Sequence, residues 1–335
     1  MVSLLHQKLT SRRLSPIYDY LSPRPFHLLN LSLTDILPEA FMPPFSDSGL
    51  TKTLPSVRNQ HRMPVGYHLV YFPPQVPLSG LLADGTDMSH SPGKPFNQRM
   101  WAGGRMTFPL DGGPLLNGQR AVCLEAIRDI TVKGHPEEEK VFVHVERRIA
   151  AVEEGEDEEG IRIRLWGNHG NGSDSGMITE RRDLVFLRDK TPEQAKVDNI
   201  NSGNDTRSNP EFSRRVIPTR ALLFRYSALM FNAHSIHYDR KYTQDIEGYR
   251  DLLVPGPLSL TLMLTALRPY LSKLSRVITE VEYRNVAPLY VDEEMEICAR
   301  GAKNCEPESL VVWIEGKDGR LALRGTMKTE KIEQG

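Results

Sequence analysis

The chain contains few cysteines. Cys123, Cys298 and Cys305 are the three among its 335 residues, and no two of them form a Cys-x-x-Cys pair. Such a sparse, odd-numbered set argues against a disulfide framework and against a structural zinc site. The three are therefore predicted to be small, semi-buried hydrophobic residues of a protein in a reducing compartment.

The sequence also lacks a long apolar run and an excess of either charge. Its longest apolar-rich stretch, residues 258–267, is shorter than the ~20 residues that span a bilayer, so it is expected to be a core helix and no membrane span is predicted. Lys and Arg number 42 against 43 Asp and Glu, a formal net charge of -1. No basic stripe with interleaved aromatic residues occurs, and nucleic-acid binding is not expected.

The first 28 residues are basic and poor in acids. Lys8, Arg12, Arg13 and Arg24 stand against a single acid, Asp19. A start of this kind is typical of a mitochondrial transit peptide, which would place the protein in the mitochondrial matrix. Prolines interrupt any long amphipathic helix in the segment. The alternative is a disordered or locally folded N-terminal arm on a cytoplasmic protein.

Beyond this arm, the length favours two domains. We predict a first domain over residues 29–187, a polar linker over 188–212 and a second domain over 213–332. Apolar and polar residues alternate along many short segments, which predicts α+β domains with mainly antiparallel sheets. The predicted strands cover residues 67–72, 120–132, 141–149, 161–166, 183–187, 276–283, 294–300, 309–315 and 321–329, and the predicted helices cover residues 220–230 and 249–270.

A group of polar side chains follows the first of these helices. Asn232, His234, His237 and Asp239 fall within eight positions. Two histidines three residues apart with an aspartate can bind zinc or iron, but no third strong ligand lies at an expected spacing, so no metal is predicted. The plain alternative is a polar loop after a helix.

The helix that follows begins with glycine and proline. Gly256 lies between Pro255 and Pro257, and Pro257 suits the first turn of a helix, where its missing N–H costs nothing. Free backbone N–H groups at such an end, with the helix dipole behind them, stabilise negative charge on a carbonyl oxygen. A histidine loop facing this end would suit proton transfer beside a polarised carbonyl.

These segments together resemble a known family. Residues 224–239, with the sequence FRYSALMFNAHSIHYD, and the Pro-Gly-Pro helix start resemble the hydratase motif of MaoC-like hotdog proteins. Within that group the chain is similar to the hydroxyacyl-thioester dehydratase type 2 and mesaconyl-CoA C4 hydratase branch. Residues 282–290 resemble the strand and turn that follow the family's helix, and residues 84–87 and 99–104 are similar to its N-terminal domain.

The resemblance implies an α+β double hotdog, in which two antiparallel sheets each wrap around a central helix and the acyl thioester binds between them. It implies reversible hydration of a 2-enoyl thioester, carried by CoA or by acyl carrier protein, without a cofactor. His237 matches the family's catalytic histidine, and Gly256 matches the residue whose N–H polarises the thioester carbonyl, with Pro257 beside it. A homodimer is an assembly that the sequence leaves open.

One departure from the motif bears on the chemistry. Asn232 stands where bacterial-type hydratases have an aspartate, and His234 and Ser235 replace the Asn-Pro of that motif. An asparagine can orient a water molecule but cannot accept its proton. Our hypothesis is that His237 transfers the proton, Asn232 positions the water, and His234 or Asp239 orients the histidine.

The first domain offers fewer candidates. Trp101 and the glycines after it are expected mainly to pack, although Trp101 also counts as a candidate for substrate binding, and Arg99 or Arg105 could contact the phosphates of CoA or phosphopantetheine. Two other activities stay open. A hotdog thioesterase would need a carboxylate or its equivalent, and the lack of an acid at position 232 counts against it. A non-catalytic thioester-binding protein is favoured by the same asparagine.

Overall fold

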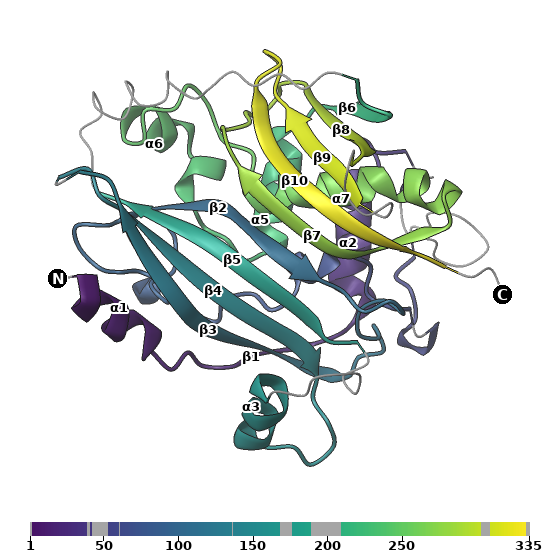
Figure 1. Cartoon of the computed structure of the whole chain (residues 1–335), viewed down its shortest axis with the longest axis horizontal. Coiled ribbons are helices and arrows are strands. Elements are labelled where there is room, and N and C mark those ends of the chain that lie inside the picture. Colours follow the sequence, from purple (N-terminus) through teal and green to yellow (C-terminus); the bar gives the residue numbers. More distant parts are fainter. Residues whose placement is uncertain are drawn as a thin grey trace.

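The computed structural model describes residues 2–38, 41, 53–59, 61–135, 137–167, 176–188, 209–302 and 309–332. Within them, ten antiparallel strands form one continuous sheet in the order β1-β3-β4-β5-β2-β7-β10-β9-β8-β6 (Figure 1). The strands are β1 (Ile17–Tyr20), β2 (Gln98–Thr107), β3 (Arg120–Lys133), β4 (Lys140–Ala151), β5 (Ile178–Leu187), β6 (Phe212–Val216), β7 (Arg276–Asn285), β8 (Met295–Gly301), β9 (Ser309–Glu315) and β10 (Leu321–Lys331). The first five strands in this order come from the N-terminal half of the chain and the last five from the C-terminal half.

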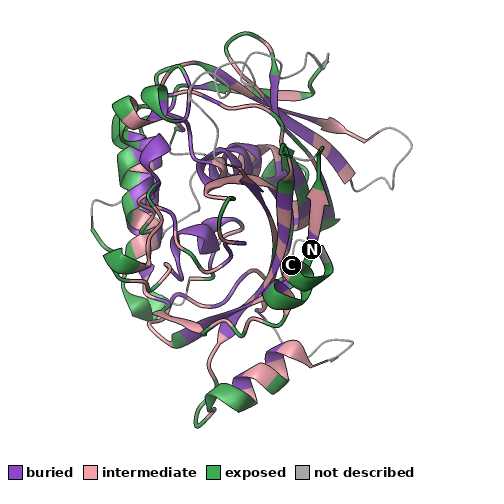
Figure 2. Cartoon of the chain, turned by 90° about the vertical axis from the view of Figure 1, so that its left-hand side faces the viewer, coloured by how far each residue is buried: buried purple, intermediate pink, exposed green. Residues whose placement is uncertain are grey.

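Helices of unequal length accompany the sheet. They are α1 (Val2–Thr10), α2 (Pro23–Leu33), α3 (Glu158–Trp166), α5 (Arg220–Leu229), α6 (Arg240–Asp245) and α7 (Gly256–Lys273), with 3-10 turns η3 (Val57–Asn59), η4 (Tyr67–Val70), η5 (Leu78–Gly80) and η6 (Ser235–His237). In Figure 2 the strands curve around buried helical segments, so the core lies inside the curve of the sheet.

The longest helix, α7, is buried along most of its length. Its apolar residues face in all directions, and a helix of this kind is stable only when it is covered on every side. The strands of the C-terminal half cover it on one side, and Leu264 contacts Gly66 of the N-terminal half on the other. The predicted helix over 249–270 therefore exists, but it begins at Gly256, because Pro255 is its N-cap and ends the preceding loop.

The N-terminal half holds shorter helices. The Tyr67 hydroxyl donates to Asn30 Oδ1 of α2 at 2.6 Å, which fixes α2 against η4 inside the core. The strand predicted over residues 67–72 is wrong: the segment forms η4, introduced by Gly66 at φ 85° and followed by Phe72 at φ 55°. The reversed backbone at both ends prevents an extended strand.

A second predicted strand, residues 161–166, is also wrong. These residues form the last two turns of α3, which Asp157 caps by accepting a hydrogen bond from the Gly160 N–H at 2.8 Å. Ile161 and Leu165, four residues apart, are buried, whereas Ile163 is exposed. The alternation of apolar and charged residues fits a strand, but a capped helix buries its i, i+4 pair equally well. The other predicted strands and the helix over 220–230 are present. Most ends shift by at most two residues, whereas the strand predicted over 183–187 begins five residues earlier, at Ile178.

The N-terminal segment takes part in the fold. Strand β1 pairs with β3, Leu9 of α1 is completely buried against strands β3, β4 and β5, and α2 crosses the domain boundary expected at residue 28. Most of the predicted linker, residues 189–208, lies outside the described residues, as does Cys305. Cys123 and Cys298 are buried and free. Among the described residues, no helix combines the length and apolar character needed to cross a membrane.

The two halves are joined edge to edge. Strand β2 pairs with β7 from Gly103 opposite Arg284 to Thr107 opposite Glu280, and a bulge between Trp101 and Gly103 bends β2 at this junction. A Cβ atom on Gly103 would lie 2.3 Å from the carbonyl oxygen of Tyr283 on β7. The close approach of the two backbones therefore requires glycine at this position.

Replacing Gly103 by alanine should destabilise the protein by about 1–3 kcal/mol, because backbone atoms of β7 have to move to accept the methyl group. Chemical denaturation monitored by fluorescence measures the change. Gly80→Ala is the matched control, since a Cβ atom there meets its nearest neighbour at an ordinary 3.4 Å. Equal stability of the two variants would contradict this account of the junction.

Candidate active site

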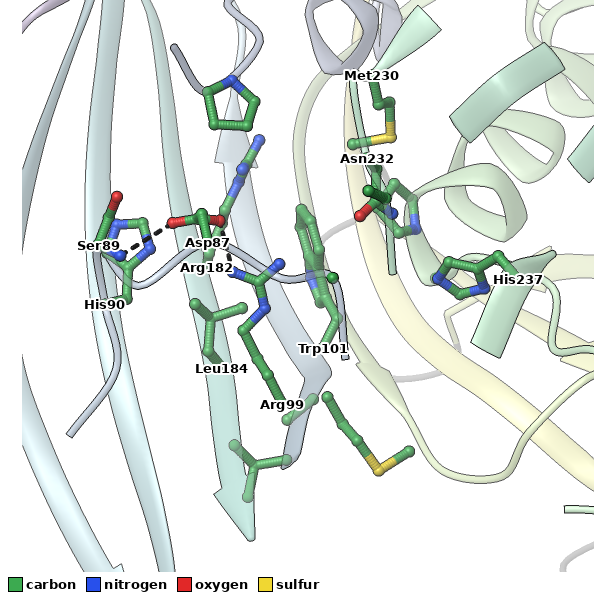
Figure 3. Close-up of a pocket in the computed structure, with 18 of the residues that line it drawn as sticks. Asp87, Ser89, His90, Arg99, Trp101, Arg182, Leu184, Met230, Asn232 and His237 are labelled. Atoms are coloured by element: carbon green, nitrogen blue, oxygen red, sulfur yellow. Dashed lines mark hydrogen bonds and ion pairs between the residues drawn. The ribbon is translucent and has the colours of Figure 1, made fainter. Parts of the chain in front are cut away.

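A cavity of about 1180 Å³ lies between the two halves. Arg99, Met100 and Trp101 of β2 line it from the N-terminal half, and Asn232 and His237 line it from the C-terminal half. In Figure 3, Trp101 stands between the Arg99 and Arg182 side chains on one side and Asn232 and His237 on the other. The cavity therefore combines a histidine and an amide with charged residues of the opposite half.

The loop that carries the histidines, residues 232–237, is held by its own backbone. Helix α5 ends at Leu229, and Phe231 reverses the chain at φ 53°. The Asn232 N–H then donates to the Ser227 carbonyl at 2.8 Å, and the turn η6 closes the loop. This 232–237 loop is thus held by backbone hydrogen bonds between α5 and α6.

His237 is held in one orientation. Its ring is buried, and Nδ1 lies 2.9 Å from the carbonyl oxygen of Leu253. A carbonyl can only accept, so Nδ1 carries the proton and Nε2 keeps its lone pair. Burial lowers the pKa of His237 to about 4, the Leu253 hydrogen bond opposes this shift, and the positive charge of Arg99 adds to it. Near neutral pH His237 is therefore an uncharged base.

Asn232 lines the same cavity. Its Oδ1 accepts a hydrogen bond from the His234 N–H at 3.2 Å, which leaves the Nδ2 amide as the group available to a ligand. An amide N–H donates, so Asn232 can hold the oxygen of a water molecule or of a substrate. The expected orienting residue Asp239 is exposed instead and caps α6 through the Tyr242 N–H at 2.9 Å. It does not face His237.

His234 is buried beside His237. The ring centroids are 5.3 Å apart at an interplanar angle of 78°, so the two rings make an edge-to-face contact. Its Nε2 lies 3.6 Å from Asp84 Oδ2 in the N-terminal half. Burial lowers the pKa of His234 well below its usual value, and His237 and Arg99 contribute further. Of the two expected orienting neighbours, His234 is therefore the one in contact with His237.

The N-terminus of α7 forms another wall of the cavity, as expected for Gly256 and Pro257. A Cβ atom on Gly256 would lie 3.0 Å from Asn285 Nδ2 and 3.6 Å from Trp101 Cβ, so glycine lets the helix end approach β2 closely. Among the described residues, none accepts a hydrogen bond from the Gly256 N–H. This N–H and the helix dipole can stabilise negative charge on a carbonyl oxygen in the cavity.

Trp101 is fixed from three sides. Its Nε1 donates to the Tyr283 hydroxyl at 2.8 Å, its carbonyl accepts from Asn285 Nδ2 at 2.8 Å, and the Arg182 guanidinium lies 4.6 Å from the ring centroid. The packing role expected for Trp101 and its position in the cavity wall thus coincide. Sequence reasoning did not identify Tyr283 or Asn285 as its partners.

Arg99 lines the cavity, whereas Arg105 forms a surface ion pair with Glu280. Arg99 Nη1 lies 2.8 Å from Asp87 Oδ2. Burial alone would raise the pKa of Asp87, but the guanidinium outweighs it and holds that pKa well below its usual range. Asp87 therefore stays ionised and neutralises Arg99.

The N-terminal half also contains a buried group of charged residues that the sequence analysis did not predict. Arg147 donates to Glu125 and Glu180 at 2.7 Å each, and His90 lies 3.0 Å from Glu125. His90, Glu125 and Arg147 line the cavity on the side of the N-terminal half. The alternation along β4 indicated this buried charge, because Arg147 occupies an inward position in the series Val141, Val143, Val145, Arg147 and Ile149.

Among the described residues, no three His, Cys, Asp or Glu side chains form a metal site.

Several known proteins are similar to this chain in sequence. The family model of the hydroxyacyl-thioester dehydratases type 2 matches residues 66–291. The mesaconyl-C(4)-CoA hydratase of Chloroflexus aurantiacus is 32% identical over 79% of this chain and 83% of its own length. The mitochondrial hydroxyacyl-thioester dehydratase type 2 of Schizosaccharomyces pombe is 29% identical over 84% of this chain and 88% of its own length.

A solved structure with a similar fold is that of a MaoC-like dehydratase from Phytophthora capsici. It aligns with a TM-score of 0.61 at 11% identity, over 97% of this chain and 99% of that chain. Together with the continuous sheet described above, to which each half contributes five antiparallel strands, this confirms the α+β double hotdog, with its two sheets joined into one. The two halves differ in their helices, since α7 has 18 residues, whereas α2 of the N-terminal half has 11 and packs against η4 and α5.

The lowered histidine pKa values should make stability depend on pH. His237 and the fully buried His68 both have a pKa of about 4 in the folded state, below the ordinary value of 6.5. Between pH 6.5 and 4 the unfolded chain binds protons that the folded chain does not, so the free energy of unfolding falls as the pH falls through this window. Each histidine should contribute on the order of 2–3 kcal/mol. Urea denaturation of wild type and His237→Gln at several pH values tests this, and an equally steep decline in both would be evidence against it.

Proposed function

Because this chain belongs to the hydroxyacyl-thioester dehydratase type 2 family, we propose that it interconverts 2-enoyl and 3-hydroxyacyl thioesters with His237 as the acid–base residue. Membership assigns the class of the reaction, the hydro-lyase addition of water to an acyl thioester. The observation that carries the residue assignment is the bond from His237 Nδ1 to Leu253, which leaves Nε2 as a neutral base in the cavity.

The proposed reaction begins with the thioester carbonyl oxygen at the Gly256 N–H. This contact withdraws electrons from the conjugated double bond and makes C3 electrophilic. Asn232 Nδ2 holds a water molecule, and His237 Nε2 removes one of its protons while the water oxygen forms a bond to C3. The π electrons move through C2 to the carbonyl oxygen, and the resulting enolate takes the proton from His237 at C2. Dehydration follows the same path in reverse.

With an asparagine at position 232, a single residue has to carry out both proton transfers. Asn232 can orient the water but cannot take its proton. His237 therefore acts as base in the first half of the reaction and as acid in the second. Its low pKa suits the return of the proton, since the buried imidazolium is a strong acid.

Two other activities remain as alternatives to be tested. A thioesterase would direct water to the carbonyl carbon. The 232–237 loop contains no carboxylate to activate that water, and Asp239, which follows the loop, caps α6. A non-catalytic thioester-binding protein would have no need of a histidine held as a neutral base. Both alternatives predict that the C2–C3 double bond survives.

The carrier and the setting belong to the same proposal. We expect acyl-CoA or an acyl carrier protein thioester as the substrate, with Arg99 near the carrier phosphates, although its pairing with Asp87 means that a phosphate would have to compete with that carboxylate. The Schizosaccharomyces pombe relative is named as mitochondrial, which supports the mitochondrial matrix as the expected location. A homodimer stays a prediction that sedimentation can decide.

Replacing His237 by alanine should lower kcat for hydration of a short 2-enoyl-CoA by about 10²–10⁴-fold, because no other group takes the proton from water. Loss of the enoyl absorbance measures the rate. His144→Gln is the matched control, since His144 pairs with Asp183 outside the cavity. Wild-type activity in His237→Ala would refute the residue assignment, and thiol release by wild type would favour the thioesterase.

A further inference from the structure

A second loop, residues 84–87 of the N-terminal half, packs directly on the 232–237 loop. The Ser235 N–H donates to the Asp84 carbonyl at 2.8 Å. Gly85, at φ 85°, lies so close that a Cβ atom there would be 1.9 Å from the Ala233 carbonyl oxygen. No side chain fits between the loops at this point. The catalytic loop of one half is therefore held by the backbone of the other.

The side chain of Asp84 is buried in this contact, with 3% of its surface exposed. Its Oδ1 accepts hydrogen bonds from the Thr86 N–H at 2.8 Å and from the Thr86 hydroxyl at 2.7 Å. Its Oδ2 has no hydrogen-bond partner among the described residues, and His234 Nε2 lies 3.6 Å away. A buried carboxylate oxygen without a partner is costly, and such exceptions call for an explanation.

His234 connects Asp84 with the proposed catalytic histidine, His237. His234 lies between them, since its Nε2 is near Asp84 and its ring meets the His237 ring at 5.3 Å. Neither Asp84 nor His234 lines the cavity, so neither touches a substrate there. The Asp84 side chain would therefore act on the reaction without touching the substrate, and His234 is the residue between its carboxylate and His237.

We propose that Asp84 is a positioning residue whose buried carboxylate, acting through His234, supplies His237 with the negative charge that the catalytic loop lacks at Asn232. The proposal rests on the function proposed above. It assigns to the N-terminal half a part in the proton transfer, in addition to its part in enclosing the substrate.

A negative charge near the histidines would favour the proposed proton transfer. When His237 takes a proton from water, an imidazolium forms in a buried site, and the cation Arg99 opposes it. Among the described residues, the titratable or charged groups that act on His237 are His234 from its own loop and Arg99 from β2, and Asp87 is already paired with Arg99. Asp84 is a buried carboxylate beside His234, and among the described residues no Arg or Lys forms an ion pair with it. Its field stabilises the imidazolium, since charges interact strongly where water is excluded.

The test is Asp84→Asn, which keeps the size of the side chain and an oxygen for Thr86 but removes the charge. Hydration of crotonyl-CoA is measured as a function of pH. We expect kcat to fall about tenfold with KM little changed, because the charge acts on the proton transfer. The acidic limb of the profile should move to lower pH, since removal of a negative charge disfavours protonated His237.

Two controls separate charge from packing. Thr86→Val removes a hydrogen bond to Oδ1 but keeps the carboxylate, so its acidic limb should stay where it is in wild type even if the protein unfolds at a lower temperature. Asp245→Asn makes the same chemical change at an exposed carboxylate on α6 that pairs with Lys241, and it should behave as wild type.

A third variant tests the route through His234. His234→Gln should lower kcat with KM retained, and the double variant Asp84→Asn/His234→Gln should be about as slow as His234→Gln alone, because both changes interrupt one contact. If Asp84→Asn does not fold, an unchanged kcat in His234→Gln still overturns the proposal. An unchanged kcat in His234→Gln, independent losses in the double variant, or an unmoved acidic limb in folded Asp84→Asn would each overturn the proposal. An inactive wild type would instead contradict the proposed function.

Discussion

A helix that is apolar on every face has to be enclosed, and the enclosure of α7 determines where the rest of this protein lies. Strands of the C-terminal half cover one side of the helix, and the segment around Gly66 covers the other. The helix is buried from Pro257 onward, and its N-terminus at Gly256 lines the cavity between the halves. The Gly256 N–H, the Trp101 wall and the histidine loop meet at that point.

The same burial explains the chemistry of the histidines. Without water around it, the charged form of an imidazole is disfavoured, and His237 is held as a neutral base. In the proposed reaction, the protein has to stabilise the positive charge that appears when His237 takes a proton. Asp87 neutralises Arg99 at the cavity wall, and Asp84 lies behind His234. Both acids come from the N-terminal half, so each half contributes to a single site.

The sequence predicted much of the fold, because alternation along antiparallel strands and the apolar face of a buried helix are local patterns. It failed where two local patterns coincide, as in residues 161–166, which fit a strand and a capped helix equally well. His237 and Gly256 could be found because they are 19 residues apart in one motif. Asp84 could not, since its contact with His234 crosses 150 positions and depends on how the halves dock. Arg147 was not predicted, although it lies at a buried position of β4 in the same alternating series as Val145 and Ile149.

The central claim is that water adds to C3 of an enoyl thioester while the thioester stays intact. Incubation of the protein with crotonyl-CoA in H₂¹⁸O, followed by mass spectrometry of the acyl-CoA, tests it most directly. The account predicts ¹⁸O in the 3-hydroxyl group of an acyl-CoA that still carries its thioester. Label in a free carboxylate together with released CoA, or an enoyl thioester that remains unlabelled and unchanged, would contradict it.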